Sequence, residues 1–190
     1  NKLNLYQEQA FKKILKLVKD KKTKPIYFDG ITGSGKTEVY FKLIKEFLKE
    51  KKQVLVLIPE IALSKQWINR FYKIFNFEPF VWNSSIKISE KKRIWQASIN
   101  GDSLIVVGTR SSIFLPFSNL GVIIVDEEND VSYKQEEKAI YNARDMAVVK
   151  SKINKSHIIL VSATPSIETY YNYNEKKYNL VALERRFGKA

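Results

Sequence analysis

The chain has 190 residues, 44% of them hydrophobic, which is enough length and apolar content for one domain with a sizeable core. It contains no cysteine, which excludes disulfides and cysteine-ligated zinc within these residues and makes a cytoplasmic location the expectation. The formal net charge of +13 favours a polyanionic partner such as nucleic acid, with a lysine-rich composition caused by A/T-rich coding as the alternative.

Two kinds of apolar pattern alternate along the chain. Apolar residues recur at helical spacing in segments 7–19, 38–50, 64–75, 89–99, 142–150 and 166–175. Short continuous apolar runs, typical of strands covered on both faces, occupy 26–28, 54–58, 104–107, 122–125 and 158–161. This alternation predicts an α/β fold with a mostly parallel, doubly wound sheet, whose ligands bind at the carboxyl ends of the strands.

We expect a single domain over residues 1–190. Its basic, amphipathic start lacks an apolar run of signal-peptide or membrane-spanning length, so neither a targeting segment nor a membrane partner is expected. Segment 183–190 ends without a further predicted element, which suggests a piece of a longer protein.

A glycine-rich loop follows the first predicted strand and leads into a predicted helix. It matches the pattern G-x-x-x-x-G-K-[ST], in which backbone amides and the helix N-terminus bind phosphates. Lys36 is expected to reach the β- and γ-phosphates, and the Thr37 hydroxyl to bind magnesium. The predicted nucleotide-binding residues are Gly30, Thr32, Gly33, Ser34, Gly35, Lys36 and Thr37. The pattern therefore predicts binding of a nucleoside triphosphate with Mg²⁺.

Two adjacent carboxylates, Asp126 and Glu127, follow the predicted strand 122–125. Asp126 is expected to hold the magnesium ion through water, and Glu127 to orient and activate the attacking water. Together with Lys36 they are the predicted catalytic residues; the alternative is an acidic turn that caps the next helix. Ser162 and Thr164 follow another strand, where their hydroxyls can hydrogen-bond the acidic segment. Hydrolysis of the nucleotide is the prediction.

Three segments follow one another in a fixed order: the phosphate loop (30–37), an acidic box (126–129) and a Ser-Ala-Thr segment (162–164). This ordered set resembles the first motor lobe of superfamily 2 helicases. The resemblance extends to the bacterial replication-restart helicases on segments 29–40, 58–63, 108–111, 126–128, 132–135, 141–145 and 162–165. It implies a three-layer RecA-like fold and the ATP-binding lobe of a 3′-to-5′ DNA helicase that acts on stalled or branched replication forks in primosome assembly. It also implies ATP and Mg²⁺ as cofactors, single-stranded and forked DNA and other primosome proteins as partners, a zinc-binding region outside these residues, and a monomeric fragment.

The resemblance assigns further roles residue by residue. Gln9 stands where related helicases keep a glutamine that reads adenine, and the alternative is a solvent-exposed helix residue. Segment 131–145 resembles an aromatic-rich coupling loop, in which the two tyrosines would stack on bases and two basic residues would meet phosphates. The alternative is a surface loop whose tyrosines pack on the next helix. The residues expected to contact DNA or to couple it to hydrolysis are Pro59, Thr109, Arg110, Tyr133, Lys134, Tyr141, Arg144, Ser162 and Thr164.

Two other interpretations stay open. Another superfamily 2 motor, such as an RNA helicase or a restriction translocase, would carry the same motor motifs. An isolated lobe would bind nucleotide and DNA with little or no turnover, because arginines from a second lobe complete sites of this kind. Asn129 stands where the family usually has His and cannot become charged, which affects the expected coupling between DNA and hydrolysis.

Overall fold

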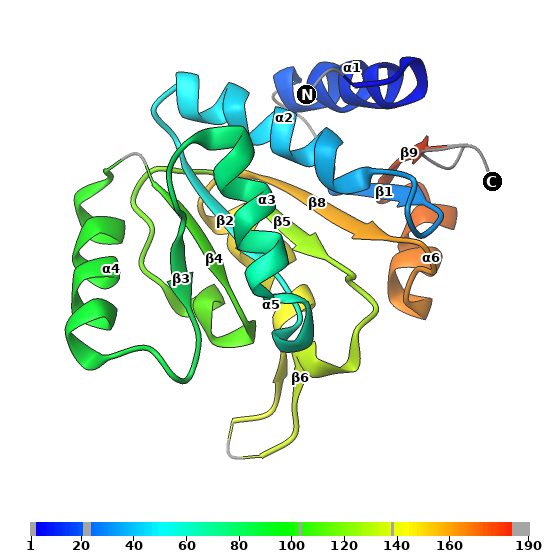
Figure 1. Cartoon of the computed structure of the whole chain (residues 1–190). Coiled ribbons are helices and arrows are strands. Elements are labelled where there is room, and N and C mark those ends of the chain that lie inside the picture. The colour runs from blue at the N-terminus through cyan, green and yellow to red at the C-terminus, as the bar shows by residue number, and fades with distance from the viewer. Residues whose placement is uncertain (1–2, 21–23, 103, 138, 184–190) are drawn as a thin grey trace.

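The computed structural model describes residues 3–20, 24–102, 104–137 and 139–183. Within these residues the main sheet has seven strands, all parallel, in the order β3-β4-β2-β5-β8-β1-β9 (Figure 1). The strands are β1 (Ile26–Gly30), β2 (Gln53–Leu57), β3 (Phe80–Trp82), β4 (Ile105–Gly108), β5 (Leu120–Asp126), β8 (His157–Ser162) and β9 (Asn179–Leu183). The prediction of a parallel α/β sheet is confirmed.

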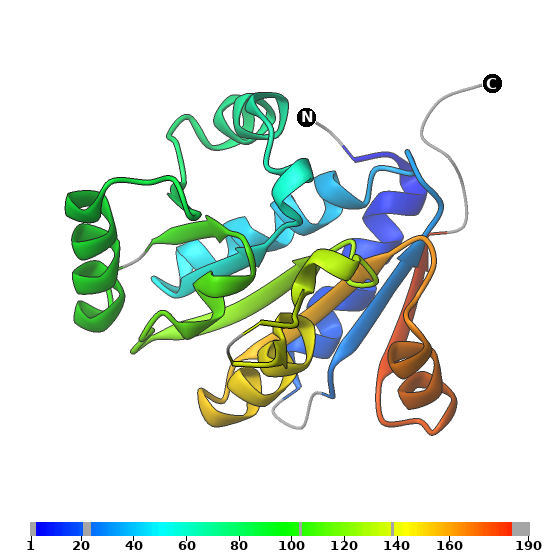
Figure 2. The same ribbon diagram turned by 90° about the horizontal axis from the view of Figure 1, so that it is seen from below.

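Helices cover both faces of this sheet (Figure 2). They are α1 (Leu5–Lys19), α2 (Lys36–Lys49), α3 (Lys65–Phe75), α4 (Ile88–Asn100), α5 (Ala143–Ile153) and α6 (Ile167–Asn174). One apolar cluster joins α1, α2 and α3 to one face of the strands. A second cluster joins α4, α5 and the 3₁₀ helix η2 (Arg110–Phe114) to the other face. The result is the expected arrangement in three layers.

The helix ends follow from local sequence. Asn4 and Gln7 form a capping box at the start of α1, each side chain accepting a hydrogen bond from the backbone of the other. The Ser166 side chain caps α6 by accepting from a backbone amide of its first turn. Asn76 and Gly101, both in the left-handed conformation, end α3 and α4.

Three strand features were not predicted from the sequence. They are edge strands β3 and β9 and the short antiparallel hairpin of β6 (Lys134–Gln135) and β7 (Tyr141–Asn142), which projects away from the sheet (Figure 1). Segment 183–190 begins with the last residue of β9, and its remaining residues lie outside the described ones. In the described part of the chain, no helix is both long enough and apolar enough to cross a bilayer.

Candidate active site

The glycine-rich loop turns the chain from the end of β1 into the start of α2. Gly33 and Gly35 have φ angles of 75° and 86°, in the left-handed region that favours glycine. A Cβ at Gly35 would lie 2.1 Å from Nε2 of Gln7, so a side chain of α1 fills the space that this glycine leaves. A Cβ at Gly33 would meet none of the described atoms within 4 Å. The loop therefore packs against α1 at Gly35 and is open at Gly33.

Lys36 and Ser34 place donor groups inside the loop. Lys36 is buried, and its Nζ donates to the backbone carbonyl of Gly30 and, at 3.3 Å, to that of Ile31. The buried Oγ of Ser34 has no hydrogen-bond partner among the described residues. Ammonium and hydroxyl groups donate to phosphate oxygens. The loop thus fits the phosphates of a nucleotide.

The loop and the acidic box share one pocket. Its volume is about 270 Å³, and its lining residues are Thr32, Gly33, Ser34, Gly35, Lys36, Thr37, Glu38, Arg70, Asp126 and Glu127. The carboxyl ends of β1 and β5 meet here because β8 alone separates these strands in the sheet. Thr37 and Asp126 are the predicted magnesium ligands, and Mg²⁺ is commonly held by few protein oxygens together with substrate phosphates. The residues present fit both groups.

The Asp126 carboxyl group is fixed by its neighbours. The Tyr40 hydroxyl donates to its Oδ2 at 2.8 Å, and Nε1 of Trp67 donates to the Tyr40 oxygen at 3.2 Å. Although the residue as a whole is half-buried, its carboxyl group is enclosed, and this burial raises the pKa of Asp126 to about 6 against the opposing effect of the Tyr40 hydrogen bond. A bound cation would favour the ionised form.

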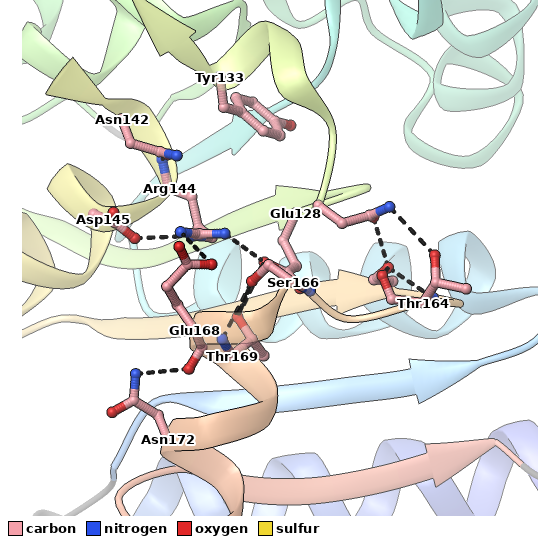
Figure 3. Close-up of polar contacts among 12 residues, drawn as sticks. Glu128, Tyr133, Asn142, Arg144, Asp145, Thr164, Ser166, Glu168, Thr169 and Asn172 are labelled. Carbon is pink, nitrogen blue, oxygen red and sulfur yellow. Dashed lines mark hydrogen bonds and ion pairs between the residues drawn. The ribbon is translucent and has the colours of Figure 1, made fainter. Parts of the chain in front are cut away.

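Glu128, the next acidic residue, is not among those that line the pocket. Its buried carboxylate accepts hydrogen bonds from the backbone amide of Ser166 at 2.7 Å, from the Ser166 hydroxyl at 2.9 Å and from the Thr169 hydroxyl at 3.0 Å (Figure 3). A guanidinium nitrogen of Arg144 lies 3.5 Å from Oε2. Glu128 therefore ties the acidic box to the start of α6 and to α5.

Asn129 connects the acidic box to the Ser-Ala-Thr segment. The Ser162 hydroxyl donates to Oδ1 of Asn129 at 2.7 Å, and Nδ2 of Asn129 donates to the Thr164 hydroxyl at 3.3 Å. Hydrogen bonds between this segment and the acidic box were expected. The structure contains them, and they run through the residue that replaces the usual His.

The predicted adenine reader and the observed loop contact differ by two residues. Gln9 is exposed on α1. Gln7 is buried, and its Nε2 donates to the carbonyls of Ser34 and Gly35, each at 3.4 Å. The capping-box spacing that starts at Asn4 was the sequence signal that could have distinguished Gln7.

A second hollow of about 330 Å³ lies at the carboxyl ends of β2, β3 and β4. Its lining residues are Ile58, Glu60, Ser84, Thr109, Arg110, Ser111, Ser132 and Gln135. Thr109 and Arg110 were expected to contact DNA, and Pro59 is buried next to this wall. A guanidinium nitrogen of Arg110 donates to the carbonyl of Lys134 at 2.8 Å. This groove brings the predicted DNA-contacting segments together.

The family model described as "Type III restriction enzyme, res subunit" matches residues 1–167. The chain belongs to this family. Curated relatives include the replication restart protein PriA of Rickettsia prowazekii (strain Madrid E), 50% identical over 98% of this chain and 28% of the relative. The PriA of Haemophilus influenzae (strain ATCC 51907 / DSM 11121 / KW20 / Rd) is 46% identical over 85% of this chain and 22% of the relative. The chain thus spans about a quarter of the length of these relatives.

Among solved structures, RecG bound to a three-way DNA junction has a TM-score of 0.69 at 23% identity, over 100% of this chain and 25% of RecG. At that identity the likeness concerns the fold alone, and it agrees with the predicted three-layer α/β arrangement.

In this member of the family, Arg144 is not available to DNA. Its side chain is 6% exposed and pairs with Asp145 at 2.9 Å and with Glu168 at 3.3 Å as well as with Glu128. Burial lowers the pKa of Arg144, but the hydrogen bond and charge of Asp145, with Glu128 and Glu168, outweigh it and raise the pKa. The expected phosphate contact is corrected to a buried structural role, because three carboxylates already surround the guanidinium.

Tyr133 is also buried. It is 1% exposed, and its hydroxyl donates to the backbone carbonyl of Asp126 at 2.5 Å. Base stacking by Tyr133 is therefore corrected to the alternative of packing. Tyr141 is half-buried and packs edge-on against Phe114, with ring centroids 5.0 Å apart, whereas Lys134 is exposed beside Glu136.

Proposed function

We propose that this chain is the ATP-binding motor lobe of a 3′-to-5′ DNA helicase that acts on stalled or branched replication forks during replication restart. The observation that carries the proposal is the single pocket in which the phosphate loop faces Asp126 and Glu127. The similarity to two replication restart proteins supports the biological setting. Other primosome proteins, a zinc-binding region and a cytoplasmic location remain predictions from the resemblance.

Each residue of the pocket has a proposed task in ATP hydrolysis. The loop amides, Ser34 and Lys36 bind phosphate oxygens, and Thr37 and Asp126 hold Mg²⁺. When bound, the magnesium ion offsets negative charge on the phosphates. Glu127 orients water and accepts its proton as the bond from the water oxygen to the γ-phosphorus forms and the bond to the ADP oxygen breaks.

The second groove is the proposed path for single-stranded DNA. Thr109, Arg110 and Lys134 would contact phosphates, and Tyr141 is the remaining aromatic side chain for stacking in this segment. Ser162 and Thr164 would report the state of the nucleotide through Asn129. Tyr133, which follows the lining residue Ser132 in the chain, is buried.

A restriction translocase is the second candidate, because the matching family is described by a restriction enzyme subunit. Both candidates use the same pocket for ATP. They differ in substrate, since a replication-restart helicase prefers forked DNA and a translocase moves along a continuous duplex.

ATP hydrolysis by the full-length protein with forked DNA, linear duplex and RNA tests these proposals. We expect forked DNA to stimulate most and Lys36→Ala to abolish turnover. Unchanged turnover in the Lys36→Ala variant would overturn the active-site assignment. Stimulation by duplex regardless of forks would favour the translocase, and preference for RNA would favour an RNA helicase. Residues 1–190 alone are expected to show little turnover.

A further inference from the structure

Arg70, in the middle of α3, lies in the wall of the phosphate pocket. No sequence motif pointed to it. Among the described residues that line the pocket, Arg70 and Lys36 supply the positive charge. Lys36 is directed at two carbonyls of the loop, whereas Arg70 reaches the same pocket from a different helix.

Glu38 holds the Arg70 guanidinium at this position. Nη2 of the guanidinium forms an ion pair with Oε1 of Glu38, which lies in the first turn of α2 directly after Thr37. The Glu38 side chain is 18% exposed and that of Arg70 is 44% exposed, so the pair lies at the mouth of the pocket. A guanidinium has five N–H donors in a planar fork, so Arg70 can keep Glu38 and bind a second oxyanion.

The charges around Arg70 also indicate where that oxyanion would be. Burial lowers the pKa of Arg70, and the negative charge of Asp126 acts in the opposite direction. Both side chains line the phosphate pocket. Arg70 therefore lines the same pocket as the loop that fits phosphates and the carboxylate that would hold their cation. Arginine is well suited to such a place, because its donors match phosphate oxygens in geometry and charge.

We propose that Arg70 binds phosphate oxygens of the nucleotide and that Glu38 is the residue that positions its guanidinium. This inference rests on the proposed ATP-binding function and adds to it a cation supplied from within the same lobe. The sequence had led us to expect arginines only from a second lobe. Arg70 is assigned to phosphate binding and does not replace those arginines.

Direct binding of ADP and of a non-hydrolysable ATP analogue to the full-length protein tests this inference without relying on turnover. We expect Arg70→Ala to weaken binding of the ATP analogue roughly tenfold or more, as the loss of a charge-assisted phosphate contact predicts. Arg70→Lys should recover part of the loss, since it keeps the charge but not the fork. Glu38→Gln should lose less than Arg70→Ala, because its side-chain oxygen still accepts one N–H.

The matched control is Arg93→Ala. Arg93 is an exposed arginine on α4 that also pairs with a glutamate, Glu90, at 2.7 Å. The Arg93→Ala variant should bind ADP and the ATP analogue with affinities within about twofold of the wild-type values. Folded Arg70→Ala protein with wild-type affinity for both nucleotides would overturn the inference. A wild-type protein that binds neither nucleotide would instead overturn the proposed function.

Discussion

At the scale of single residues, the site combines groups that spacing identifies with groups that only the fold brings near. The phosphate loop and the carboxylates Asp126 and Glu127 were predicted, because the backbone geometry and chemistry they supply require particular residue types at fixed spacing. Gln7 and Arg70 come from other helices; the capping-box spacing could have distinguished Gln7, whereas no local pattern identifies Arg70. The predicted DNA contacts of Tyr133 and Arg144 were wrong because they followed from the resemblance of segment 131–145 to a coupling loop, whereas the fold supplies buried partners for both side chains.

Replacing Asp126 by Asn should make stability less dependent on pH. The folded pKa of about 6 lies above the ordinary value of 3.8, so the folded state keeps a proton that the unfolded state loses between these values. As pH rises from about 4 to 6, the free energy of unfolding of the wild type should therefore fall by up to about 3 kcal/mol relative to that of Asp126→Asn. Above about pH 6 the difference between the two proteins should stay constant. Denaturant unfolding at several pH values measures it. A difference that grows above pH 7 would contradict the assignment.

Gln7→Ala should weaken nucleotide binding several-fold, because it removes the side chain that fills the space beside Gly35 and contacts two loop carbonyls. Gln9→Ala, on the exposed face of the same helix, is the matched control and should change affinity less than about twofold. Titration with a fluorescent adenine nucleotide gives both values. A larger loss for Gln9→Ala would restore the residue that the sequence first indicated.

At the scale of elements, Glu128 and Arg144 join the end of β5, α5 and α6 into one polar cluster. The long apolar strands and amphipathic helices around it were predictable, since their periodicity is dictated by burial. The edge strands were not, because β3 has only three residues and β9 follows a run of polar residues. The β6–β7 hairpin has two residues in each strand, too few to show any alternation.

Glu128→Ala should lower the free energy of unfolding by about 3–5 kcal/mol, because it leaves a buried guanidinium without one of its partners and several donors without an acceptor. Glu90→Ala removes an exposed ion pair of α4 and should cost less than about 1 kcal/mol. Chemical denaturation of both variants provides the comparison. Equal costs would mean that the cluster does not stabilise the fold.

At the scale of the whole molecule, the net charge of +13 leaves open whether basic residues mark a DNA path or only reflect composition. The groove beside Arg110 lies at the carboxyl ends of the strands, and other lysines, such as Lys152 on α5, lie beside a hollow at their amino ends. Basic residues at the carboxyl ends of the strands can therefore be compared directly with basic residues at the amino ends of the same sheet.

Arg110→Ala should weaken single-stranded DNA binding and reduce the dependence of log affinity on log salt by about one phosphate contact. Lys152→Ala removes one positive charge near the amino ends of the strands and should leave that slope unchanged. Binding measured at several salt concentrations gives both slopes. If the two variants lose affinity and slope equally, charge alone attracts DNA and the groove has no special role.

The position of β1 between β8 and β9 has a consequence for how the protein is made. The strand that leads into the phosphate loop is synthesised before both strands that hydrogen-bond to it, because β8 and β9 lie far downstream in the chain. On the ribosome, this strand must wait without its neighbours until nearly all of the lobe has emerged, and its unpaired edges are then open to wrong pairing. The phosphate loop is therefore translated well before the strands that hold β1 in the sheet, and the pocket can form only after β8 and β9 have been made.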